Sequence, residues 1–114
     1  MIRAEIRGGG LTMVDGFSAE IETLELIAAF IRRLQPEVVV ECGGFRGVGA
    51  VYMAKALKSN GHGKLYCIEK EKIGVDVIKS QIKKHNLMLW CDVVHGESQR
   101  VDIPGPYGFV FHDG

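Results

Sequence analysis

The chain has 114 residues, of which 46% are hydrophobic and 25% are charged, and its formal net charge is zero. This length allows one domain with a hydrophobic core, and the composition is that of a globular protein rather than a disordered or fibrous one. Because 14 basic residues balance 14 acidic ones, no large electrostatic field favours nucleic acid or an anionic membrane as a partner. No stretch has the roughly 20 apolar residues of a membrane span, and the first residues lack the apolar run of a secretory signal, so we expect a cytoplasmic protein.

A first helix is predicted between Ser18 and Leu34, where apolar residues recur at helical spacing. Ser18 is the expected N-cap, and Pro36 prevents the helix from continuing. We therefore divide the chain into an N-terminal segment, residues 1–17, and one folded domain, residues 18–114.

Strands and helices are then expected in alternation. The β-branched run Val38–Val40 predicts a strand that is buried on both faces. The elements expected after it are a helix over 48–59, a strand over 64–68, a helix around 73–85, and strands near 91–95 and over 107–112. The turn at residues 60–63, with two glycines, ends the second helix.

This alternation predicts an α/β fold with a doubly wound, mainly parallel sheet that is covered on both faces. If the four predicted strands are numbered along the chain, their expected order in the sheet is 3-2-1-4. A cleft should open at the switch point between the first and fourth strands, at residues 41–47. The fourth strand would lie at an exposed sheet edge, where a second copy or a partner chain could pair with it.

The three cysteines, Cys42, Cys67 and Cys91, lie far apart among apolar residues. Their number is odd, and the chain has no Cys-x-x-Cys pair that could help to close a zinc site. We interpret them as buried strand thiols, and no metal site is predicted.

The turn Glu41-Cys-Gly-Gly-Phe-Arg-Gly47 is the most informative segment, because its glycines let a ligand approach the backbone closely. The turn does not match the dinucleotide pattern Gly-x-Gly-x-x-Gly, since Phe45 stands where the second glycine is required. The Glu41 carboxylate would repel a pyrophosphate and would favour a ligand that carries an ammonium or a sulfonium group.

Acidic residues also stand at the ends of the later strands. Glu69 ends the second strand, where a carboxylate can accept hydrogen bonds from two ribose hydroxyls. Glu97 and Ser98 follow the third strand, and Asp113 follows the fourth. Taken singly, Glu69 and Glu97 could also be solvated acids, and Asp113 could be a cap.

In this order, the four motifs between Val38 and Gly114 resemble those of class I, Rossmann-like methyltransferases that use S-adenosylmethionine, in particular the small-molecule O-methyltransferase-like branch. The resemblance implies a catalytic role for Asp113, although in some relatives an aspartate there binds a divalent cation. The cofactor-binding residues that it implies are Glu41 near the methionine end, Gly43, Gly44 and Gly47 in the turn, Glu69 at the ribose, and Glu97 with Ser98 at the adenine.

The implied reaction is methyl transfer to an oxygen of a small-molecule or sugar-like acceptor. The family fold has more strands than the four predicted here, so we expect the chain to be the N-terminal part of a larger, otherwise incomplete fold. Two alternatives stay open: a non-catalytic nucleotide- or cofactor-binding module completed by a partner chain, and an NAD(P)-binding domain. Residues 8–13 could either fold over the cofactor or form a mobile tail.

Overall fold

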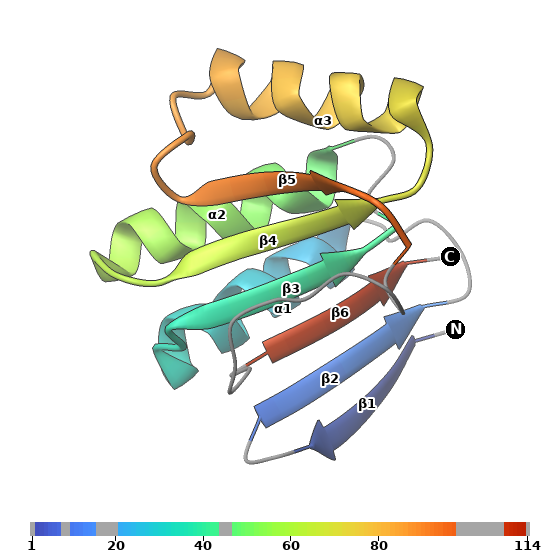
Figure 1. Cartoon of the computed structure of the whole chain (residues 1–114). Helices are drawn as coiled ribbons and strands as arrows, with labels where there is room; N and C mark the ends of the chain where they lie inside the picture. Colours follow the sequence, from blue (N-terminus) through green and yellow to red (C-terminus); the bar gives the residue numbers. More distant parts are fainter. Residues whose placement is uncertain (1, 8–9, 16–20, 44–46, 98–108, 114) are drawn as a thin grey trace.

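The structure is a computed structural model that describes residues 2–7, 10–15, 21–43, 47–97 and 109–113, with side chains for residues 21–43 and 47–97. Helices and strands alternate from α1 to β5 (Figure 1). Along the chain the elements are β1 (Ile2–Arg7), β2 (Gly10–Asp15), α1 (Ile21–Leu34), β3 (Val38–Cys42), α2 (Val48–Asn60), β4 (Lys64–Glu69), α3 (Lys72–Lys84), β5 (Cys91–His95) and β6 (Phe109–Asp113).

The strands form one sheet with the order β1-β2-β6-β3-β4-β5. All neighbouring strands are parallel except β1 and β2, which form an antiparallel pair. The four strands predicted from the sequence are β3, β4, β5 and β6, and their order in space is the predicted 3-2-1-4. The switch point therefore lies between β3 and β6, as expected.

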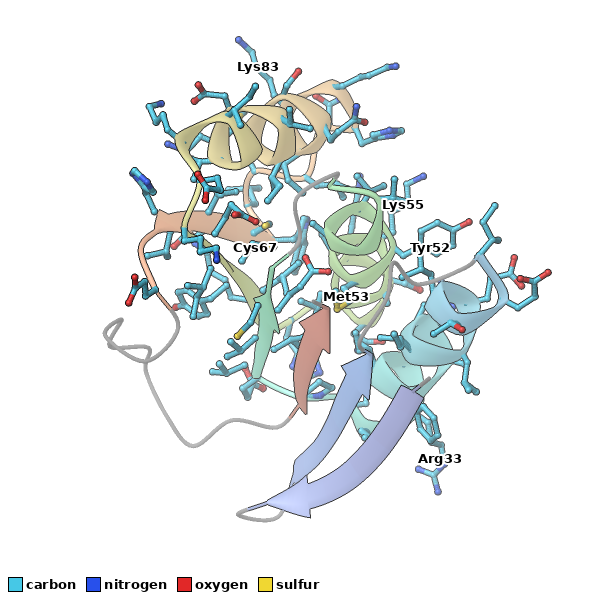
Figure 2. The ribbon with its side chains drawn as sticks, turned by 90° about the vertical axis from the view of Figure 1, so that its right-hand side faces the viewer. Arg33, Tyr52, Met53, Lys55, Cys67 and Lys83 are labelled. Atoms are coloured by element: carbon cyan, nitrogen blue, oxygen red, sulfur yellow. The ribbon has the colours of Figure 1, made fainter. Side chains whose placement is uncertain are left out.

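The three described helices lie on one face of the sheet (Figures 1 and 2). The main core fills the space between these helices and the sheet, where Ile27, Leu57, Leu65 and Ile78 are fully buried. On the opposite face, Val40 and Ile68 anchor a smaller apolar cluster. The doubly wound order predicts that helices cover this second face as well. None of the helices in the described ranges does so.

Strand β6 is not an edge strand, which corrects the prediction from the sequence. It pairs with β3 on one side and with β2 on the other, with Leu11 opposite Phe109 and Asp15 opposite Asp113. The run Leu-Thr-Met-Val has the composition of a strand, and its pairing satisfies backbone groups of β6 that would otherwise stay open. Residues 10–13 are thus neither a mobile tail nor a cover over a ligand, and the outer strands of the described sheet are β1 and β5.

The helix boundaries follow the local signals in the sequence. Helix α2 ends at Asn60 and is capped by Gly61, whose backbone is left-handed with φ 81° and whose N–H donates to the carbonyls of Leu57 and Lys58. Ser18, the expected N-cap of α1, lies outside the described residues. Among the helices that the structure describes, none has the length and hydropathy of a membrane span.

Candidate functional site

The strands β3, β4, β5 and β6 are parallel, so their carboxyl ends lie together at one end of the sheet (Figure 1). Backbone hydrogen bonds extend beyond the strands there. The N–H of Gly43 donates to the carbonyl of Ile68 at 3.0 Å, and the N–H of Gly96 donates to the carbonyl of Glu69 at 3.0 Å. The segments that carry the predicted site residues are therefore held side by side at the expected end of the sheet.

Glu41 lies on the helix-covered side of β3 and is only 1% exposed. The thiol of Cys67 on β4 donates to its Oε1 at 3.3 Å, and the two residues are direct partners in the β3–β4 register. A Cβ atom on Gly49 would lie 2.5 Å from Oε2, so the carboxylate approaches the first turn of α2. The positive end of a helix dipole favours a carboxylate at this position.

Cys67 and Cys91 are free thiols and are buried, as the sequence predicted, whereas Cys42 is only half-buried and the prediction was wrong for it. The sulfur atoms of Cys67 and Cys91 are 3.8 Å apart. The hydrogen bond with Cys91, burial and the negative charge of Glu41 raise the pKa of the Cys67 thiol, in that order of importance. Cys67 therefore keeps its proton. Among the residues whose side chains are described, no cluster of three metal-ligating groups occurs.

Gly47 stands immediately before α2 and has a φ of 75°, a backbone conformation that favours glycine. A Cβ atom there would also lie 3.2 Å from both Cα of Ile78 and Cγ of Gln81 on α3. The end of the turn is therefore packed against α3 without room for a side chain. Gly44, the middle glycine of the predicted set, lies outside the described residues.

Glu69, at the end of β4, is 4% exposed and is not the solvated acid of the alternative interpretation. Its Oε1 accepts a hydrogen bond from the backbone N–H of Glu71 at 3.0 Å. Its Oε2 is buried and has no hydrogen-bond partner among the residues that the structure describes. Since an unpaired buried oxygen costs about 1–3 kcal/mol, a ligand hydroxyl at this oxygen would be stabilised.

The remaining predicted residues are less closely defined. Glu97 lies two residues beyond β5 and is exposed. Its exposure is compatible both with a binding role and with an ordinary surface acid. Asp113 ends β6, one residue beyond the paired Cys42 and His112, which places its backbone beside the glycine turn. Ser98 lies outside the described residues.

Two residues of the site were not predicted from the sequence. Cys67 contacts Glu41 because of the β3–β4 register, which no local pattern reveals. Gly49 is detectable in the sequence, because glycine is unfavourable within a helix. A glycine there indicates that a side chain at this position would clash with a neighbour. That signal could have indicated a close approach at this turn.

The mainly parallel sheet and its switch point define a Rossmann-like α/β domain. Residues 40–114, well over half of the chain, match a family model described as a methyltransferase domain. The chain therefore belongs to this methyltransferase family. No curated protein sequence matches it.

Solved structures of methyltransferases have the same fold. The O-methyltransferase TomG from Streptomyces achromogenes, in complex with SAM, has a TM-score of 0.74 and 23% identity, over 86% of this chain and 46% of that one. An O-methyltransferase from Bacillus cereus in complex with SAH has a TM-score of 0.75 and 19% identity, over 87% and 47%. SAH-bound PaMTH1 from Podospora anserina has a TM-score of 0.77 and 13% identity, over 85% and 42%. The chain thus spans less than half the length of each.

Proposed function

We propose that the chain is the S-adenosylmethionine-binding part of an O-methyltransferase, with the cofactor domain at residues 18–114 and a cytoplasmic location. The observation that carries the proposal is Glu69, a buried carboxylate with one oxygen held by a backbone N–H and the other without a partner in the described part of the chain. In a sheet of the methyltransferase family, this position at the end of β4 suits a pair of ribose hydroxyls.

The residues at the glycine turn also fit this cofactor. Glu41 is buried beside the turn, so its charge is weakly screened and favours a ligand with positive groups over a pyrophosphate. The left-handed backbone of Gly47 shapes the end of the turn before α2. We propose that Gly43, Gly44 and Gly47 together form a turn whose backbone the cofactor approaches closely. Glu97 and Ser98, which follow β5, are proposed to hold the adenine.

When bound, S-adenosylmethionine would supply an electrophilic methyl group, and the chain's own task is to align the acceptor and remove its proton. We propose Asp113 for proton removal, because β6 ends directly beside β3 at the switch point. Two of the similar structures are described as O-methyltransferases, which supports an oxygen nucleophile on a small-molecule or sugar-like acceptor. No metal site is part of the proposal.

A second copy or a partner chain could add to the described sheet at β1 or β5. Pairing through β6 is not proposed, because both of its sides are occupied.

Calorimetric titration of the whole chain with S-adenosylhomocysteine and with NAD tests the proposal. We expect binding of S-adenosylhomocysteine and no comparable binding of NAD, because Glu41 and the glycine spacing disfavour a pyrophosphate. Tighter binding of NAD would show that the chain is a dinucleotide-binding domain instead.

Replacement of Glu69 tests the residue that carries the proposal. Hydrogen bonds to a charged group contribute about 1.5–3 kcal/mol, so Glu69→Ala should weaken S-adenosylhomocysteine binding roughly tenfold or more. Glu71→Ala is the matched control, because it removes a neighbouring exposed acid and keeps the backbone N–H that Glu69 uses. Equal affinities for these two variants would contradict a role of Glu69 at the ribose.

A further inference from the structure

A thiol on the neighbouring strand contacts the buried carboxylate of the glycine turn. Cys67 Sγ donates to Glu41 Oε1 at 3.3 Å across the β3–β4 register. The exposed fractions of the two residues are 0% and 1%, so solvent does not compete for this hydrogen bond. Figure 2 shows Cys67 in the interior, between the sheet and the helices.

The thiol of Cys91 lies within hydrogen-bonding distance of the thiol of Cys67. Cys91 on β5 has its sulfur 3.8 Å from that of Cys67. A thiol carries one proton, and an ionised carboxylate can only accept hydrogen bonds. When Cys67 donates to Glu41, its sulfur is therefore free to accept from Cys91, and the two thiols form a short chain that ends on the carboxylate.

The opposite side of the carboxylate is constrained by α2. Oε2 lies so close to Gly49 that any side chain there would collide with it. The carboxylate is thus confined between a donor on β4 and the first turn of the helix that follows residues 43–47. A rotation of Glu41 would move its charge away from the start of α2.

We propose that Cys67, backed by Cys91, is a positioning residue that holds the Glu41 carboxylate beneath the glycine turn. This inference rests on the proposed function, in which Glu41 and this turn serve the methionine end of the cofactor. Cys67 acts through Glu41 and does not itself contact the ligand.

Raman spectroscopy of the S–H stretching region tests the contact in the whole chain without any ligand. Cys67→Val identifies the Cys67 band, which we expect at the lowest frequency of the three thiols because its acceptor is a carboxylate. In Glu41→Gln this band should move to higher frequency, because an amide oxygen is a weaker acceptor. An unchanged set of S–H bands in Glu41→Gln would overturn the proposal.

Ligand affinity tests the consequence. Because Cys67→Val no longer holds the Glu41 carboxylate beneath the turn, we expect it to bind S-adenosylhomocysteine about fivefold more weakly. Cys67→Ser keeps a donor and should bind more tightly than Cys67→Val. The matched control is Leu65→Val, a change at a fully buried residue on the same face of β4 that alters packing alone. Equal weakening in Cys67→Val and Leu65→Val would mean a packing role only and would overturn the proposal.

Backbone amide chemical shifts separate this inference from the proposed function. We expect the amide signals of Gly43 and Gly47 to shift in Cys67→Val and to stay in place in Leu65→Val. If the unmodified chain fails to bind S-adenosylhomocysteine, the proposed function is wrong, and the amide shifts and S–H bands still decide whether Cys67 positions Glu41. If Cys67→Val does not fold, Cys67→Ala removes the same donor and provides the same comparison.

Discussion

Gly49 shows how one buried acid constrains the residues around it. The residue lies in the first turn of α2, where alanine would favour the helix over glycine by about 1 kcal/mol. A Cβ atom there would collide with Glu41 Oε2 at 2.5 Å and also contact Leu24. Insertion of a methyl group into a packed site costs about 1–3 kcal/mol, so steric exclusion outweighs helix propensity at this position.

We expect Gly49→Ala to lower the free energy of unfolding by up to about 2 kcal/mol, the steric cost less the gain in helix propensity, measured by urea denaturation. In a Glu41→Ala background the same change should cost less, because the colliding carboxylate is gone. Greater stability of Gly49→Ala than of the unmodified chain would show that Glu41 moves aside without cost.

His62 joins two connections at the end of the sheet opposite the candidate site. It lies between α2 and β4, and its Nε2 is 2.8 Å from Gln35 Oε1 in the connection between α1 and β3. Its Nδ1 lies 2.8 Å from Glu37 Oε1. Nearby, Asn60 donates to the carbonyl of Ile31 at 3.0 Å. These side-chain contacts hold the ends of α1 and α2 together, beside their apolar contact.

Removal of this link should reduce stability with no effect on ligand binding. We expect His62→Ala to lower the free energy of unfolding by about 0.5–1.5 kcal/mol, the usual contribution of a partly exposed hydrogen bond. His85→Ala, at the exposed end of α3, is the control and should change stability by less than about 0.5 kcal/mol. A loss of equal size in both variants would contradict a specific role of His62.

Helix α3 carries an exposed ion pair that gives a pH dependence of known sign. Lys72 Nζ donates to Asp76 Oδ1 at 2.6 Å, one helical turn away. This hydrogen bond is the main cause that lowers the pKa of Asp76 below its ordinary value. The contribution to stability is therefore present above the ordinary aspartate pKa and is lost as the pH falls through the lowered one.

An NMR titration of the Asp76 carboxyl group checks this interaction. In Lys72→Met we expect the pKa of Asp76 to rise toward its ordinary value, because the first cause of the shift is removed. The stability difference between the unmodified chain and Asp76→Asn should be small at neutral pH and should disappear in acid, since exposed ion pairs contribute little. An unchanged Asp76 pKa in Lys72→Met would show that other groups dominate.

For the molecule as a whole, the N-terminal strands complete the sheet on the side where the sequence predicted an exposed edge. β2 and β6 are parallel neighbours although almost the whole chain separates them. The family match covers residues 40–114, so β6 lies inside it, whereas β1 and β2 lie outside it. The sheet therefore depends on a segment that the methyltransferase motifs do not include.

Hydrogen exchange measures whether β6 is flanked on both sides. The N–H of Leu65 donates to the carbonyl of Trp90, and the N–H of Gly96 donates to the carbonyl of Glu69. In this parallel pairing, alternate residues of β5 bond to β4, and the residues between them, such as Val93, point their backbone N–H and C=O groups away from β4. We expect the amides of residues 109–113 to exchange more slowly than that of Val93, because β6 has a neighbour on each side. Equally fast exchange would contradict the pairing of β2 with β6.

Interruption of β2 should expose β6 and promote association between chains. Thr12→Pro removes a backbone donor from the middle of β2, where proline is unfavourable. We expect a larger molecular mass by size-exclusion chromatography with light scattering than for Thr12→Val, which keeps the strand. A monomeric Thr12→Pro variant would show that β6 does not need this cover.

The elements from α1 to β5 could be predicted from the sequence, because helical periodicity, β-branched runs and the stops at Pro36 and Gly61 are local properties. The order 3-2-1-4 followed as well, since right-handed crossovers leave few arrangements for alternating strands and helices. The positions of Glu41 and Glu69 at one edge of the sheet follow from that order alone.

The contacts of these acids could not be predicted in the same way. The pairing of Cys67 with Glu41 and of β2 with β6 depends on strand register between distant segments, which many packing contacts specify together. The burial of Glu69, which excludes a solvated surface acid, likewise arises only when β4 is covered by its neighbours. Local patterns identify which residues can form a site, and long-range packing selects their partners.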